Sequence, residues 1–82
     1  MDEGTELYYE IICTILRAQP CSRAELAEHL SAFAVAWAGD NGKPIDKAFI
    51  SRRIEHIVGA TERLTRPGIE FITCQMARSL LE

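Results

Sequence analysis

Residues 46–59 read D-K-A-F-I-S-R-R-I-E-H-I-V-G, and this stretch predicts the helix around which the chain is organised. Its apolar residues recur at i, i+4, i+7 and i+8, which is the period of one helix face. These inward residues are Ile50, Ile54, Ile57 and Val58. Asp46 is a good N-cap, and Gly59 is typical of a helix end. We therefore expect a helix over 46–58 with an apolar inner face and an outer face that carries Arg52 and His56.

Length and composition indicate one small globular domain over residues 1–82. The chain has 82 residues, of which 48% are apolar and 26% are charged, as is usual for such domains. The longest apolar run, residues 32–38, is too short to span a bilayer. The acidic start M-D-E-G-T-E lacks the basic segment of a secretion signal. We therefore expect a cytoplasmic protein with no membrane segment.

The cysteines and histidines form no pattern that indicates a metal site or a catalytic centre. Cys13, Cys21 and Cys74 cannot all pair within one chain, and they lack the C-x-x-C spacing of zinc sites. The chain contains no glycine-rich phosphate loop, no H-E-x-x-H and no G-x-S-x-G motif. We expect reduced thiols, no metal, no cofactor and no enzymatic activity.

The net charge of −3 is unevenly distributed along the chain. Residues 1–42 contain seven acidic and two basic residues, whereas residues 43–82 contain five acidic and seven basic residues. The second part therefore predicts a surface for an anion, with a solvated charged face as the alternative.

Two further helices are predicted before residue 46. Residues 5–18 carry a wide apolar stripe behind Thr5, a plausible N-cap. The S-R-A-E sequence at 22–25 is a capping box, and the helix that it starts continues to about Ala38. The end of this helix, A-F-A-V-A-W-A, is apolar nearly all round and needs cover from other helices or from a second subunit. Phe33 and Trp37 are thus expected in the core or at a dimer interface.

The remainder of the chain predicts a small β-hairpin. Residues 60–65 alternate in polarity, Arg66-Pro67-Gly68 is a turn signature, and residues 69–73 are β-prone. Residues 75–82 then predict a short helix. The expected fold is mostly α with a small β-hairpin: three helices, the hairpin over 60–73 and a short C-terminal helix.

This order of elements resembles the winged helix-turn-helix domains of small bacterial, phage and archaeal regulators. The segments that carry the resemblance are S-R-A-E-L-A-E-H-L at 22–30, D-K-A-F-I-S-R-R-I-E-H-I at 46–57 and the hairpin at 64–73. In that family the third helix enters the major groove of DNA and the wing contacts the backbone. The resemblance implies a small transcriptional regulator that binds double-stranded DNA, and we expect a homodimer.

The resemblance also implies which residues contact DNA. On the third helix, Arg52 would read a guanine edge, and arginines on the wing would bind phosphates. The implied DNA-binding residues are Lys47, Ser51, Arg52, Arg53, His56, Arg63 and Arg66.

A second function from another class remains open at this stage. The same scaffold would serve in protein–protein binding, as an adaptor or as a phage-type inhibitor of a host complex. The sequence pI of about 5.3 suits this alternative, because a basic domain is usual for nucleic-acid binders. The acidic first half of the chain, residues 1–42, would then bind a basic partner.

Overall fold

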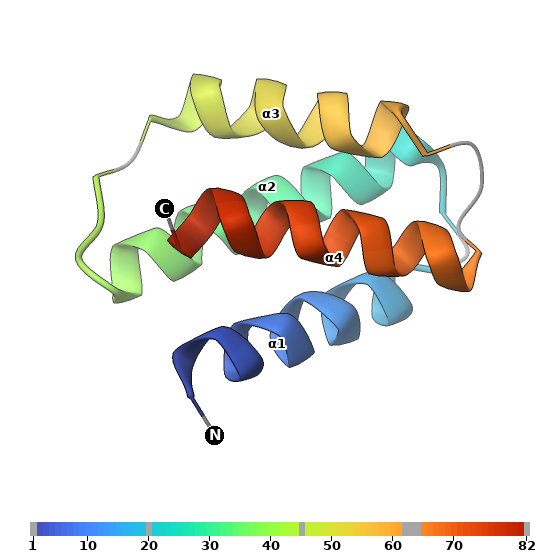
Figure 1. Cartoon of the computed structure of the whole chain (residues 1–82). Coiled ribbons are helices and arrows are strands. Elements are labelled where there is room, and N and C mark those ends of the chain that lie inside the picture. The colour runs from blue at the N-terminus through green and yellow to red at the C-terminus, as the bar shows by residue number, and fades with distance from the viewer. Residues whose placement is uncertain (1, 20, 45, 62–64, 82) are drawn as a thin grey trace.

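Four helices make up almost all of the chain in the computed structural model, which describes residues 2–19, 21–44, 46–61 and 65–81. Figure 1 shows the helices around a shared core, with α2 behind α4 and with α1 and α3 on opposite sides of them. No described residue lies in a β-strand. The helices are α1 (Glu3–Ala18), α2 (Arg23–Asp40), α3 (Lys47–Gly59) and α4 (Arg66–Leu81).

Short polar side chains cap the starts of the first three helices. Ser22 Oγ accepts a hydrogen bond from the Glu25 amide at 3.1 Å. Asp46 Oδ1 accepts one from the Phe49 amide at 3.1 Å, which confirms the predicted N-cap of α3. The prediction that Thr5 caps the first helix is wrong, because Asp2 is the N-cap and accepts from the Thr5 amide at 2.8 Å.

The core is formed by the side chains that the helical period turns inward. In α3, Ile54, Ile57 and Val58 are buried and Ile50 packs against them, so the predicted inner face is confirmed. The other three helices supply the rest of the apolar core. These residues are Leu7, Ile11, Ile15, Leu26, Ala27, Leu30, Ala34, Trp37, Ala38, Ile72, Met76 and Leu80.

The predicted β-hairpin over 60–73 is wrong, because residues 66–73 form the first half of α4. Thr65 Oγ1 accepts a hydrogen bond from the Gly68 amide at 3.4 Å, and the Thr65 carbonyl accepts one from Ile69 at 2.8 Å. This is the pattern of an N-cap residue. Pro67 then lies in the first turn, where a missing N–H breaks no helical hydrogen bond. Over the described residues the fold is therefore all-α with four helices, and the predicted short C-terminal helix is the end of α4.

Packing explains why the β-prone residues of this segment are helical. Ile69, Ile72, Thr73, Met76 and Leu80 follow the helical period and turn toward the core. The buried Thr73 hydroxyl donates to the Ile69 carbonyl at 2.7 Å, which satisfies its hydrogen-bonding capacity inside the helix. Burial of one apolar face outweighs the modest β-propensity of the branched side chains.

The connection between α2 and α3, residues 41–46, is longer than the three or four residues of a helix-turn-helix turn. The connection passes through Gly42, whose φ of 65° is in the left-handed region. Figure 1 shows α3 running back alongside α2, and this is the largest of the interhelical interfaces. The smallest of the main interfaces lies between α3 and α4.

Candidate functional site

An apolar groove opens between α3 and α4, at the interface where these helices pack least closely. Its volume is about 380 Å³, within the range of about 300–1,000 Å³ that is usual for ligand pockets. Ile50, Ile54 and Ile57 form the α3 wall, whereas Met76 and Leu80 form the α4 wall. The two walls of the groove therefore come from residues that lie about 20 to 30 positions apart in the sequence.

Small side chains on α2 create the space at the bottom of the groove. Ala34 and Ala38 are both buried and stand four residues apart, so they lie on the same side of α2. Larger residues at these two positions would fill the gap between α3 and α4. The alanine-rich end of α2 thus determines the depth of the groove.

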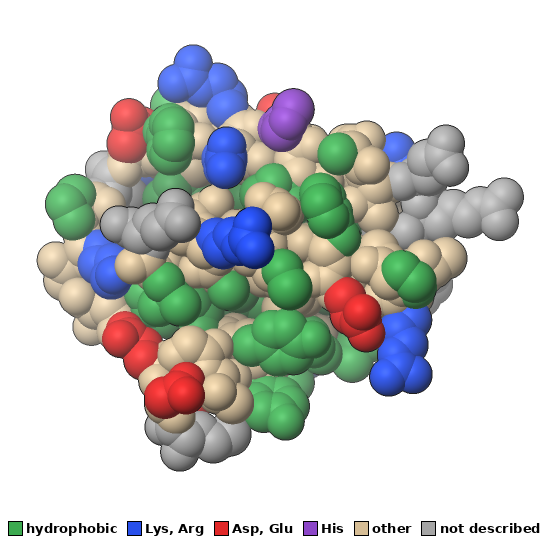
Figure 2. Space-filling model, in the orientation of Figure 1, with side chains coloured by type: hydrophobic (Ala, Val, Ile, Leu, Met, Phe, Trp, Pro, Cys, Tyr) green, Lys and Arg blue, Asp and Glu red, His purple; other side chains and the backbone are tan. Residues whose placement is uncertain are grey.

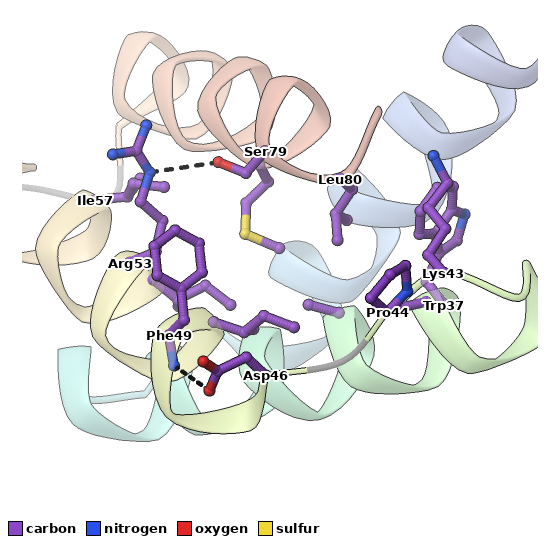
Figure 3. Close-up of a pocket in the computed structure, with 14 residues that line it drawn as sticks. Trp37, Lys43, Pro44, Asp46, Phe49, Arg53, Ile57, Ser79 and Leu80 are labelled. Atoms are coloured by element: carbon purple, nitrogen blue, oxygen red, sulfur yellow. Dashed lines mark hydrogen bonds between the residues drawn. The ribbon is translucent and has the colours of Figure 1, made fainter. Parts of the chain in front are cut away.

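Phe49 and Arg53 form the outer edge of the groove on the α3 side. Figure 3 shows both side chains projecting from the same side of α3, with Arg53 reaching Ser79 on α4. Arg53 Nε donates to Ser79 Oγ at 3.5 Å. Phe49 is 59% exposed, which is high for a phenylalanine at the edge of a concave apolar surface.

The other end of the groove is formed by Trp37, Lys43 and Pro44 (Figure 3). Trp37 is only 8% exposed and belongs to the core. The Lys43 ammonium lies over the indole, with Nζ 5.2 Å from the ring centroid. At this distance a cation is attracted to the negative face of the ring. The contact places a positive charge at this end of the groove.

A basic row runs along α3 next to the groove. Phe49, Arg52, Arg53 and His56 stand at i, i+3, i+4 and i+7 and are all exposed, so they share one face of the helix. Among the described residues, no carboxylate lies within ion-pair distance of Arg52 or Arg53. We call these four residues the α3 row. Figure 2 shows Lys and Arg side chains over α3 and α4, with acidic side chains near the start of α1 and at further points over α3 and α4.

The other residues for which the resemblance implies DNA contact lie apart from the α3 row. Lys47 is exposed at the start of α3, and Ser51 is half-buried in a shallow hollow against α2. Arg66 forms an ion pair with Glu70 at 3.5 Å, at the start of α4. This is about 20 Å along α4 from Ser79, at 1.5 Å per residue. Arg63 lies outside the described residues.

Other sequence expectations concern dimer contacts, metals and membranes. Phe33 is half-buried and packs against the core that contains Trp37. Within the described ranges, no three His, Cys, Asp or Glu side chains form a cluster that could hold a metal ion. No helix of the described chain has the length and apolar character needed to cross a membrane. Cys13, Cys21 and Cys74 are free.

Sequence reasoning did not predict the groove. One signal was present: Phe49 falls outside the inward period of its helix, so this large aromatic residue had to be exposed. Ala34 and Ala38 gave a second signal, because small residues at i and i+4 leave room beside a helix. Neither signal indicates which helices border the space.

Comparisons with family models, with curated proteins and with solved structures found no match to this chain. The resemblance to winged helix-turn-helix domains therefore stays a prediction, and its wing is overturned by α4.

Proposed function

We propose that this protein is a protein-binding module whose α3–α4 groove receives an apolar segment of a partner. The observation that carries the proposal is the concave apolar groove with Phe49 59% exposed at its edge. Burial of such a side chain is worth about 1.5–3 kcal/mol. Aromatic residues, phenylalanine among them, are enriched in the cores of protein interfaces.

The shape of the groove favours a helical segment as the ligand. It lies between α3 and α4 and is open to solvent beside Phe49 and Arg53, which are both exposed. Grooves of this kind bind the apolar face of an amphipathic helix, whose anchors stand at i, i+3, i+4 and i+7. The basic edge formed by Arg53 and Lys43 adds polar contacts around the apolar centre.

Selection of peptides from a random display library on the full 82-residue chain tests this proposal. We expect peptides with regularly spaced large apolar residues, and we expect them to shift the NMR signals of residues that line the groove. Phe49→Ala should weaken their binding at least tenfold. Phe71→Ala is the matched control, because Phe71 is 43% exposed and does not line the groove. Failure to select groove-binding peptides, or equal losses in both variants, would contradict the proposal.

DNA binding is a second candidate, and a specific observation supports it. Arg52, Arg53 and His56 lie on one exposed face of α3, as a helix in the major groove requires. A gel shift with generic duplex DNA at low salt tests it. Binding that falls steeply with salt and is lost in Arg52→Ala would favour this candidate. No shift at micromolar protein, together with groove-binding peptides, would favour the protein-binding module.

A further inference from the structure

We infer that the segment bound in the groove is an acidic amphipathic helix, whose carboxylates lie along the arginines of the α3 row. This inference rests on the proposed function and specifies the chemistry of the partner. It follows from the charges around the groove, from the hydrogen bonding of Arg53 and from the length of the α3 wall.

The charges at the edge of the groove are mainly basic. Lys43 and Arg53 line it directly, and Arg52 lies next to Arg53 on the same exposed face. Asp46 also lines the groove, but its Oδ1 accepts the Phe49 amide and serves as the N-cap of α3. A partner with acidic residues would therefore meet two arginines and a lysine, whereas a basic partner would be repelled.

Arg53 is placed to bind a carboxylate from outside the chain. Its Nε donates to Ser79 Oγ at 3.5 Å, so the side chain reaches over the groove toward α4. No described carboxylate lies within ion-pair distance of its terminal nitrogens. A guanidinium group binds a carboxylate through two parallel hydrogen bonds. An acidic side chain of the partner would supply this carboxylate.

The length of the α3 wall sets the length of the bound helix. The wall runs from Phe49 to Ile57, which at 1.5 Å per residue is about 12 Å. This corresponds to about two helical turns, enough for three apolar anchors at i, i+3 or i+4, and i+7. The acidic residues would stand beside these anchors, on the side of the α3 row.

The experiment uses the selected peptides in matched synthetic forms, titrated against the full chain by fluorescence anisotropy. We expect Asp and Glu to be enriched next to the apolar anchors. Replacement of these acids by Lys should weaken binding at least tenfold, and added salt should weaken binding of the acidic form. Arg53→Glu should weaken the acidic form about tenfold and improve binding of the Lys form.

Arg66→Glu is the control for net charge, since it changes the total charge equally at a site about 20 Å away along α4. It should leave both affinities within about twofold. Groove-binding peptides without acidic enrichment, or Lys forms that bind as tightly, would overturn this inference and leave the proposed function standing. Absence of any groove-binding peptide would overturn both. Binding of duplex DNA in place of peptides would assign the α3 row to nucleic acid and would also overturn both.

Discussion

Arg53 on α3 and Ser79 on α4 are joined by a hydrogen bond of 3.5 Å across the mouth of the groove, although 26 residues separate them in the sequence. The bond connects the two helices whose interface is the smallest of the main ones. Most of the contacts that hold α3 in place are instead with α2. This edge of the groove is therefore held to α4 by few contacts, which leaves Arg53 available to bind a ligand.

Ser79→Ala should change the free energy of unfolding by less than about 0.5 kcal/mol. The bond is at the upper limit of hydrogen-bond length and both side chains are exposed, so solvent replaces it readily. Urea unfolding measures the change. A loss of about 2 kcal/mol in the free energy of unfolding would contradict this prediction, because it would show that the α3–α4 interface depends on this hydrogen bond.

The inner face of α3 and two helix starts were predictable from sequence because they depend on local chemistry. The period of Ile54, Ile57 and Val58 needs only a helix with one buried side. Ser22 and Asp46 accept hydrogen bonds from amides three residues further on, so both partners lie within one short segment.

The start of α4 was missed because Thr65 to Gly68 carries two local signals. Proline followed by glycine indicates a turn, but threonine followed by proline two residues later also fits a capped helix. The helical spacing of the apolar residues from Ile69 to Leu80 distinguishes a capped helix from a turn. It is recognisable only when the residues after Thr73 are included. The groove could not be predicted, because its width depends on how closely α3 and α4 pack.

Gly59 and Gly42 should respond in opposite ways to substitution by alanine. Gly59 is the last residue of α3 and has no positive φ, and an added methyl group meets no atom within 4 Å beyond the adjacent residues and the backbone of its own helix. Gly59→Ala should therefore stabilise the protein by about 0.4–1 kcal/mol, through lower entropy of the unfolded chain. Gly42 also has open space, but its φ is 65°. Gly42→Ala should destabilise by about 1–2 kcal/mol.

Thermal and urea unfolding of both alanine variants check this prediction. The same sign of change in the two variants would contradict it, since surrounding space is equal at the two positions and only the backbone conformation differs.

Thr73 allows the two contributions of a buried threonine to be separated. The side chain is fully buried, and its hydroxyl donates to the Ile69 carbonyl at 2.7 Å. Thr73→Val keeps the shape and removes the hydroxyl, so stability should change by less than about 1 kcal/mol. Thr73→Ser keeps the hydroxyl and removes a buried methyl group, which should cost about 1 kcal/mol. A larger loss for Val than for Ser in urea unfolding would show that the hydrogen bond outweighs packing.

Asp2 should give the protein a pH-dependent contribution to stability. Hydrogen bonds from the Thr5 amide, and then from the Thr5 side chain, lower the pKa of Asp2 from its ordinary value of 3.8. A lowered pKa in the folded state stabilises the protein above the unfolded pKa, and this stabilisation is lost as the pH falls through the folded value. Asp2→Asn keeps a good N-cap without the titration. The stability difference between native protein and Asp2→Asn should therefore be constant from pH 5 to 7 and should shrink as the pH falls below about 4. Urea unfolding at these pH values measures it, and a difference that grows on acidification would contradict the assignment of Asp2 as the charged cap of α1.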